Sequence, residues 1–471
     1  MADGNFDADL VVIGAGPGGY VAAIRAAELG GKVICVEKEY LGGTCLNLGC
    51  IPSKVLIASV ERLNQVKHAG ALGVKVDGKI EMDFDAMIAR VKKIVKTQRG
   101  GVCMLFKKNG VEHIEGFAKF LDANTIEVEK DGKKREIRAR NFILATGSSV
   151  LYLKIPGLEG ENVWTSDDAV FPPFAPKSML VIGGGAVGVE FAYVFNGLDT
   201  ETTVVEMLPN LIPMFDEDLG VELERQFKKQ GVKILCGSTV EKAEKTKKGW
   251  KCTVKGPNGT QQIEADVVLL GVGRKANTEG MNLEKVGVKL HKNGVEVANS
   301  RMQTHVPNIY AVGDMIGKVL LAHVASMEGI VAAENCVLNN GKEMDYRAFP
   351  NVVFTVPEIA SVGLTEGEAK AQGYDVTVGK FHFRPLGKSM AAAEQEGFVK
   401  VVAEKKYGEL LGMHILGVHA SDLIHEGVAA IKLEATLDYL MDTIHAHPTF
   451  AEAILEAYEK AAHDGKSIHT L

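Results

Sequence analysis

The sequence predicts an α/β fold in which a strand–helix–strand unit occurs twice and is followed by a separate α+β domain. Residues 9–38, DLVVIGAGPGGYVAAIRAAELGGKVICVEK, contain a hydrophobic strand, a glycine turn, an alanine-rich helix and a second strand. Residues 178–207, SMLVIGGGAVGVEFAYVFNGLDTETTVVEM, repeat this plan. From about residue 346 the pattern changes to alternating strands and an amphipathic helix, with no further glycine turn of this kind.

Three glycines and one acid recur in the two units at a constant offset of 169 residues. They are Gly14, Gly16, Gly19 and Glu37 in the first unit and Gly183, Gly185, Gly188 and Glu206 in the second. In such a turn the first glycine allows a tight bend, the second lets the backbone approach a pyrophosphate, and the third lets the helix pack closely on the strand. The helix N-terminus offers free N–H groups to the phosphates. One copy would leave open tight packing without a ligand, whereas two copies favour two Rossmann-like dinucleotide-binding domains.

The acid at the end of the second unit also indicates which dinucleotide that unit prefers. A 2′-phosphate beside Glu206 would meet a like charge, and no Lys or Arg follows until Arg225. The second site is therefore expected to prefer NAD over NADP.

A cysteine pair lies between the first unit and a following helix, in GGTCLNLGCIPSK at residues 42–54. In an ideal helix, residues five apart are roughly 8–9 Å apart at Cα, whereas a disulfide needs about 4.4–6.8 Å. If Cys45 and Cys50 form a bridge, the backbone between them must be irregular, which Gly49 permits, and Pro52 suits the first turn of a helix. The alternative is two small buried residues that never meet. An accessible, strained bridge at a helix start is typical of redox work, and beside two dinucleotides it would serve as a third redox station.

The bulk composition excludes several classes of function. The chain has 471 residues, with 53 Lys and Arg against 60 Asp and Glu, and a net charge of −7. A mildly acidic balance without a basic cluster argues against nucleic acid as partner, and no run of 18 apolar residues predicts a membrane span. The first residues are acidic and enter a strand within ten positions, so no leader is expected and a cytoplasmic location is predicted, although a processed organellar chain would look the same.

The remaining segments set the expected domain boundaries. Residues 141–150 and 267–274 are apolar strands that run into glycine turns and end the two units, and residues 308–315 form a similar strand. Asp314 stands at the carboxyl end of that strand, where ligands of open α/β sheets bind; the alternative is a turn-forming Asp. The proline-rich residues 151–177 are expected to be a crossover. The expected domains are residues 1–150 continued by 275–345, then 151–274, then 346–471.

The C-terminal domain carries a candidate base. Its sequence predicts a hairpin with a turn at KKYGE, followed by an amphipathic helix with Ser421 as N-cap. In HAHPTFAE, Thr449 and Glu452 have the spacing of a capping box. His447 precedes that helix, and Glu452 could orient its ring and raise its basicity, as a thiol-activating base requires.

Together these motifs resemble the flavoprotein disulfide reductases, and within them the branch that oxidises dihydrolipoamide. GAGPGGY, GGTCLNLGCIPSK, YAVGD and HAHPT carry the resemblance, which covers essentially the whole chain. It implies FAD in the first domain, NAD in the second, and a C-terminal domain that forms a homodimer. It also implies the lipoyl domains of 2-oxo-acid dehydrogenase or glycine-cleavage complexes as partners. The alternatives are another NAD(P)H-dependent reductase of this type and a non-catalytic NAD-binding scaffold subunit.

The resemblance assigns a role to each candidate residue. Cys45 would exchange with the substrate dithiol, Cys50 would face the flavin, and His447 would be the base, oriented by Glu452. The residues implied for FAD are Gly14, Gly16, Gly19, Glu37, Lys54, Thr146, Gly147, Asp314 and Ala322. Those implied for NAD are Gly183, Gly185, Gly188, Glu190, Glu206 and Gly273. Lys54 would pair with Glu190 near the flavin, and His447 would serve the neighbouring subunit's disulfide. The bond between His447 and Pro448 would be cis, and no metal site is implied.

Overall fold

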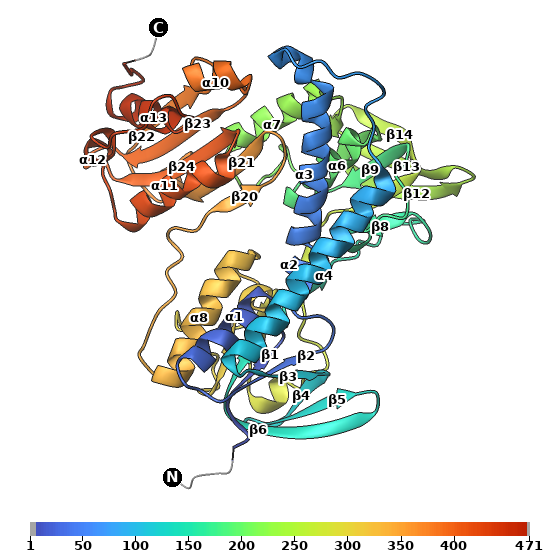
Figure 1. Ribbon diagram of the computed structural model, residues 1–471, viewed down its shortest axis with the longest axis vertical. Coiled ribbons are helices and arrows are strands. Elements are labelled where there is room, and N and C mark those ends of the chain that lie inside the picture. Colours follow the sequence, from blue (N-terminus) through green and yellow to red (C-terminus); the bar gives the residue numbers. More distant parts are fainter. Residues whose placement is uncertain (1–5, 469–471) are drawn as a thin grey trace. The chain divides into compact units, whose positions relative to one another are not determined.

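The structure is a computed structural model that describes residues 6–468 (Figure 1). Its contacts divide the chain into two units. Unit 1 comprises Met1–Ser53, Ile88–Leu151 and Gly273–Asp345, and unit 2 comprises Lys54–Met87, Tyr152–Val272 and Tyr346–Leu471. The division into three domains at residues 150, 274 and 345 stays a prediction.

Unit 1 is built on one large sheet with the strand order β3-β2-β1-β6-β5-β4, with β19 paired to β6. Its strands are β1 (Ala8–Ile13), β2 (Val33–Glu37), β3 (Glu112–Glu115), β4 (Phe117–Asp122), β5 (Thr125–Lys130), β6 (Lys133–Leu144) and β19 (Ile309–Ala311). The strands β3, β2, β1, β6 and β19 are parallel, so their carboxyl ends meet at one edge. Helix α1 (Pro17–Glu28) packs beside α8 (Ala322–Leu338), as Figure 1 shows.

The smaller elements of unit 1 connect this sheet to the rest of the chain. They are α2 (Gly43–Asn47), β7 (Ser148–Val150), β16 (Arg274–Ala276), η2 (Glu284–Val286), β17 (Leu290–His291), β18 (Gly294–Val295) and η3 (Gly313–Ile316). Two long helices, α3 (Cys50–Lys67) and α4 (Phe84–Asn109), each have residues in both units, and η1 (Ala69–Leu72) lies between them in the chain.

The first part of unit 2 holds a five-stranded parallel sheet with the order β11-β10-β9-β15-β8. Its strands are β8 (Val163–Thr165), β9 (Ser178–Ile182), β10 (Glu201–Val205), β11 (Lys233–Leu235) and β15 (Val267–Leu270). The helices are α5 (Ser166–Ala169), α6 (Ala186–Gly197) and α7 (Glu217–Lys229). An antiparallel meander of β12 (Thr239–Thr246), β13 (Gly249–Gly256) and β14 (Gly259–Ala265) follows α7 and β11.

The second part of unit 2 is an antiparallel sheet with the order β20-β21-β24-β23-β22. Its strands are β20 (Asn351–Val353), β21 (Glu358–Gly363), β22 (Val376–His382), β23 (Phe398–Glu404) and β24 (Leu410–Gly417). The helices are α9 (Glu366–Ala371), α10 (Gly387–Ala392), α11 (Ala420–Lys432), α12 (Leu437–Met441) and α13 (Glu452–Ala462). Helix α11 packs on β21 and β24, whereas α13 packs on β22 and β23, so β24 is buried along its whole length.

A buried ionic cluster joins the two parts of unit 2. The Lys400 side chain on β23 is only 5% exposed, and its ammonium donates to Asp216 at 2.8 Å and contacts Asp218 at 3.0 Å. The third partner, Glu366 at 2.9 Å, belongs to α9. Asp216 caps the N-terminus of α7, so one ammonium connects α7, β23 and α9.

The predicted α/β class is confirmed, and three local expectations are corrected. Ser421 is not the N-cap, because the N-cap of α11 is His419, two residues earlier, which adopts a left-handed conformation with φ of 58°. Thr449 is not the N-cap of the helix that follows His447, because α13 has Ala451 at that position, while the Thr449 amide donates to Glu452 Oε2 at 2.8 Å and its hydroxyl donates to the Ala446 carbonyl at 2.7 Å. The expected crossover at 151–177 contains the sheet strand β8 and the short helix α5. The predicted β23–β24 hairpin is confirmed.

Among the described residues, one helical stretch is long and apolar enough to cross a membrane by length and composition alone, Gly43–Lys67. This stretch consists of α2 and α3, which are separated at residues 48–49, and 44% of its most apolar 18-residue window is buried. Core helices of other proteins pass the same test.

Candidate active site: two glycine turns and a cysteine pair

The first glycine turn follows β1 and leads into α1. Gly14 has φ of +101°, and a Cβ there would lie 2.3 Å from the Ala145 carbonyl oxygen. A Cβ on Gly19 would lie 1.9 Å from the Gly14 oxygen, so both positions require glycine. Around Gly16 the nearest atom to a Cβ, the Gly43 Cα, is 3.9 Å away. The turn is therefore closed by two glycines and open at the middle one, where a phosphate can approach the backbone.

The second turn, between β9 and α6, repeats this geometry. Gly183 has φ of +108° and would place a Cβ 2.5 Å from the Gly271 oxygen. A Cβ on Gly188 would lie 1.9 Å from the Gly183 oxygen, whereas a Cβ on Gly185 would meet nothing within 4 Å. The middle glycine is again the open one.

The acid of each unit holds its turn through two backbone hydrogen bonds. One donor is the amide that follows the first glycine, and the other is the amide two residues after the acid itself. The donors are Ala15 (2.7 Å) and Glu39 (2.8 Å) to Glu37, and Gly184 (2.6 Å) and Leu208 (2.7 Å) to Glu206. A carboxylate has about four acceptor sites, so each acid retains capacity for a ribose hydroxyl.

A cavity of about 330 Å³ lies beside the first turn, within the size range of small-molecule sites. Gly14, Glu37, Gly116, Phe117 and Thr146 are among its lining residues. The glycines, the acid and this cavity all fit a dinucleotide whose phosphates approach Gly16.

Asp314 lies on η3, directly after β19, at the carboxyl edge of the unit 1 sheet. Its carboxylate accepts a 2.5 Å hydrogen bond from the Ser148 hydroxyl and lies 3.8 Å from the Arg274 side chain. Arg274 itself donates to the Ser148 hydroxyl and carbonyl, each at 2.7 Å. Ser148 follows the predicted Gly147, whose φ is +66°, and Ala322 is the first residue of α8.

The cysteine pair spans the break between two helices. Cys45 lies on α2 and Cys50 begins α3, and both are partly exposed. A Cβ on Gly49 would lie 3.2 Å from the Thr44 oxygen and 3.4 Å from the Cys45 Cα, so the chain folds back closely over Cys45. The backbone irregularity that the spacing predicts is thus present. Burial raises the pKa of the Tyr20 phenol, and the nearby Cys45 raises it further.

This cysteine segment packs directly on the first glycine turn. Gly42, with φ of +89°, donates its amide to the Ala15 carbonyl at 2.8 Å. Gly43, with φ of +58°, would place a Cβ 2.6 Å from the Gly16 Cα. The segment that carries the thiols therefore adjoins the phosphate-binding position of the first site.

Unit 2 contains a histidine–carboxylate pair. His447 Nδ1 lies 2.7 Å from Glu452 Oε1, and the Thr449 amide donates to Glu452 Oε2 at 2.8 Å. When Nδ1 carries the proton, Nε2 keeps the basic lone pair. The His447 side chain is 78% exposed, and the peptide bond between His447 and Pro448 is cis, as the resemblance implied.

Comparison with known proteins places this geometry in a family. The family model described as pyridine nucleotide-disulphide oxidoreductase matches residues 8–329, and the model of the dimerisation domain of the same family matches residues 349–458. The chain belongs to the pyridine nucleotide-disulphide oxidoreductase family. It is an oxidoreductase of the flavoprotein disulfide type, and FAD and NAD are the cofactors of this family.

Curated relatives match over nearly the whole chain. The chain is 40% identical to dihydrolipoyl dehydrogenase 1, mitochondrial, of Arabidopsis thaliana, over 98% of this chain and 92% of the relative. It is 42% identical to a dihydrolipoyl dehydrogenase of Thermus scotoductus, over 98% and 99% of the two chains. It is also 40% identical to a leghemoglobin reductase of Glycine max, over 97% of this chain and 88% of the relative.

A solved structure supports the fold. The Cu(II) complex of the HOCl-induced flavoprotein disulfide reductase RclA from Escherichia coli has a TM-score of 0.85 to this chain. The two are 24% identical, over 96% of this chain and 98% of the other.

A lysine–glutamate pair that is implied for this family forms within unit 2. Lys54 on α3 donates to both carboxylate oxygens of Glu190, at 2.8 and 3.0 Å. The Phe354 amide donates to the same carboxylate at 3.0 Å, and the Lys54 ammonium lies 4.4 Å from the centre of the Phe354 ring. The position of this pair at a flavin stays a prediction, as does a role for Gly273.

The sequence reasoning missed a second histidine in the dimerisation domain of this family member. The His445 side chain is 6% exposed, and its Nε2 lies 3.2 Å from Glu426 Oε1. The hydrogen bond with Glu426 raises the pKa of His445, against the effect of burial. In the sequence, the signal that could have singled out His445 is its position two residues before His447.

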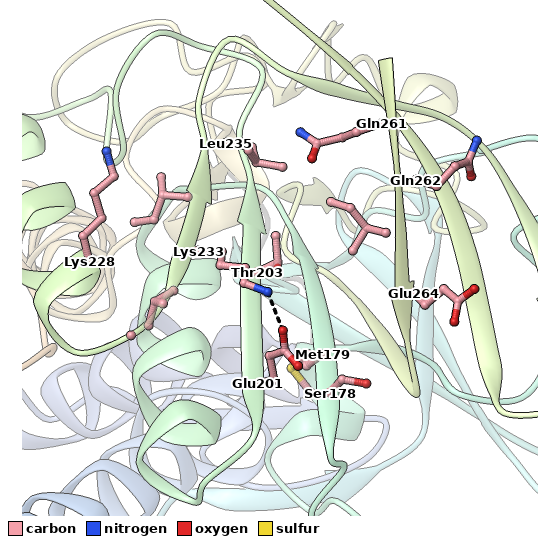
Figure 2. Close-up of a pocket in the computed structure, with 14 residues that line it drawn as sticks. Ser178, Met179, Glu201, Thr203, Lys228, Lys233, Leu235, Gln261, Gln262 and Glu264 are labelled. Atoms are coloured by element: carbon pink, nitrogen blue, oxygen red, sulfur yellow. Dashed lines mark hydrogen bonds and ion pairs between the residues drawn. The ribbon is translucent and has the colours of Figure 1, made fainter. Parts of the chain in front are cut away.

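A second cavity, of about 620 Å³, lies in unit 2, and Figure 2 shows residues that line it. Ser178 and Glu201, which line it, are the first residues of β9 and β10, whereas the glycine turn follows the last residue of β9. Lys233 forms an ion pair with Glu201 at 2.5 Å across this cavity, as Figure 2 shows. Because ligands of open α/β sheets bind at the carboxyl ends of strands, this cavity is not the dinucleotide site.

Proposed function

We propose that the chain is a dihydrolipoyl dehydrogenase, which oxidises dihydrolipoamide to lipoamide with NAD⁺ as acceptor. One observation carries the proposal: the segment with Cys45 and Cys50 packs directly on the phosphate turn of the first dinucleotide site. The full-length relatives that bear this name support the same substrate.

The two sites divide the cofactors between the units. In unit 1, the first turn, Glu37 and the adjoining cavity would hold FAD, together with Thr146, Gly147, Asp314 and Ala322. In unit 2, the second turn and Glu206 would hold NAD, and the Glu206 carboxylate disfavours a 2′-phosphate. The bound FAD would supply two-electron transfer between the cysteine pair and NAD⁺.

The chemistry of the chain's own residues is thiol–disulfide exchange. His447 Nε2 accepts the proton of a substrate thiol while Glu452 holds Nδ1–H. The substrate thiolate attacks Cys45 Sγ and breaks its bond to Cys50, which leaves as a thiolate. The second substrate thiol then attacks the mixed disulfide and releases lipoamide, leaving both cysteines reduced. Ping-pong kinetics should follow.

The dimerisation domain indicates a homodimer. We propose further that His447 acts on the disulfide of the neighbouring subunit. In its support, the His447 side chain is 78% exposed in the single chain, and nearby Ile444 is 97% exposed. Lipoyl domains as substrates and a cytoplasmic location are part of the same proposal; the relatives include mitochondrial and bacterial proteins.

The deciding experiment measures NAD⁺ reduction by the purified protein with free dihydrolipoamide. Dihydrolipoamide should be oxidised with NAD⁺ far faster than reduced glutathione, and NADP⁺ should be a poor acceptor. Activity with glutathione and NADP⁺ instead would favour another reductase of the family. A colourless protein that binds NAD without turnover would favour the scaffold alternative.

A further inference from the structure

Arg99 occupies an unusual position on α4, the long helix that follows η1. The buried stripe of this helix contains Val91, Val95, Val102 and Phe106. Arg99 lies four residues after Val95 and three before Val102, so it falls on this stripe, where an apolar side chain is expected. A cation at such a position needs a specific partner.

The partner of Arg99 is the loop that carries the cysteines. Arg99 Nε donates to Asn47 Oδ1 at 2.9 Å, and the guanidinium lies 4.1 Å from the centre of the Tyr40 ring. Asn47 is 2% exposed, and its Nδ2 donates to the Leu41 carbonyl at 3.0 Å and the Gly43 carbonyl at 2.8 Å. Because both amide hydrogens are committed to carbonyls, the orientation of the Asn47 oxygen toward Arg99 is fixed.

These contacts brace the redox segment from both sides. Asn47 stands two residues after Cys45 and three before Cys50, at the end of α2. Tyr40 begins a turn in which its own carbonyl accepts a hydrogen bond from the Gly43 amide at 3.0 Å. Arg99 therefore contacts the segment on both sides of Cys45, at Tyr40 before it and at Asn47 after it.

We propose that Arg99 is a positioning residue that holds the turn between Cys45 and Cys50 and whose positive charge favours the thiolate form of the reduced pair. The inference rests on the proposed role of these cysteines as the redox pair. The bond to Asn47, two residues from Cys45 and three from Cys50, fixes the guanidinium beside the segment that carries both thiols. A cation fixed near a thiol stabilises the thiolate, which is both the nucleophile and the leaving group of disulfide exchange. The other titratable groups beside the segment are Tyr20 from α1, Tyr40, and Lys54, which lies four residues after Cys50 on α3. Under the proposed function, the partner subunit's His447 would also face the pair.

The test is the pH dependence of alkylation of the reduced holoenzyme by iodoacetamide, followed at Cys45 and Cys50 by peptide mass spectrometry. In Arg99→Met the midpoint of the more acidic cysteine should rise by roughly 0.5–1 pH unit, the size expected for loss of a nearby charge. Arg99→Lys, which keeps the charge but not the planar fork, should restore at least half of that shift.

Lys96→Met is the matched control, because it removes an exposed cation from the same helix three residues away. It should leave the midpoint within about 0.2 unit of the wild type, as expected for a screened surface charge. An unchanged midpoint in Arg99→Met, or an equal shift in Lys96→Met, overturns the proposal. If Arg99→Met does not fold, Arg99→Gln also removes the positive charge and is compared with the wild type in the same way.

The alkylation readout does not depend on dihydrolipoamide or NAD⁺. Failure of wild-type turnover would refute the proposed function, whereas the midpoint shift would still decide the role of Arg99.

Discussion

Replacement of Lys400 by Met should strongly destabilise unit 2. The change removes the ammonium that contacts Asp216, Asp218 and Glu366, while the Met side chain fills a similar volume. The Asp216 side chain is 4% exposed, so its carboxylate would stay in a buried place without a cation. Breaking a buried pair from one side costs about 3–5 kcal/mol.

The surrounding contacts place the expected loss at the lower end of that range. Asp218 keeps Lys380 at 3.3 Å, and Glu366 keeps Lys370 at 2.5 Å. Among the described residues, the hydrogen-bond donors that remain to Asp216 are the backbone amides of Asp218 and Glu366, each at 3.2 Å. The loss of unfolding free energy should therefore be about 3 kcal/mol.

The effect should depend on pH with a definite sign. Burial, the largest single effect, would raise the pKa of Asp216, but the hydrogen bond from Lys400, the nearby charges and the Glu366 amide together outweigh burial and leave that pKa lowered. A lowered carboxyl pKa contributes stability above the ordinary value near 4, and this contribution is lost as the pH falls through the folded value. The difference between wild type and variant should thus be largest near pH 7 and shrink below about pH 4.

Urea unfolding followed by tryptophan fluorescence measures this difference. Trp164 and Trp250 are both buried and both belong to unit 2, so their emission reports its unfolding. Lys370→Met is the matched control, since it removes an exposed cation that also pairs with Glu366. A loss below about 1 kcal/mol in Lys400→Met, the upper range of a surface pair, would refute the reasoning, as would an equal loss in the control.

Four further predictions concern the proposed reaction. Cys45→Ser should abolish lipoamide turnover and leave the flavin absorbance intact; full activity would contradict its role. His447→Gln should slow turnover by roughly 10²-fold or more, and a near-normal rate would make this histidine structural. Glu206→Arg should weaken NAD⁺ and strengthen NADP⁺ in steady-state KM measurements, because it removes a like charge from beside the 2′-phosphate. Gly188→Ala, whose Cβ would lie 1.9 Å from a carbonyl, should unfold the second turn, whereas Gly185→Ala should fold but lose NAD affinity in titration calorimetry.

The features that the sequence predicted are those encoded by local spacing. The glycine turns, the break at Gly49 and the pairing of His447 with Glu452 each follow from residues within a few positions of one another or from a repeated motif. The glycine turns and the break at Gly49 depend on whether a Cβ would fit, and the pairing of His447 with Glu452 depends on the reach of one side chain. Neither property requires knowledge of the rest of the chain.

The features that it missed depend on partners distant in sequence. Ser421 fails as an N-cap because the Glu358 carboxylate, 63 residues earlier, accepts its amide at 2.9 Å, while His419 takes a left-handed conformation. The bond between Arg99 and Asn47 spans 52 residues. The bond between Lys400 and Asp216 spans 184 residues, and no periodicity marks either pair.

The equality of the two glycine turns has a consequence for selectivity. Both acids accept hydrogen bonds from equivalent amides and both turns leave the middle glycine open, so the two turns offer the same contacts to the ADP half of FAD and to that of NAD. FAD and NAD share their ADP half, and a free ADP molecule should compete at both positions. Discrimination between FAD and NAD must then come from the residues that surround the other half of each molecule. An inhibitor that is selective for one site must therefore contact those residues rather than the ADP region.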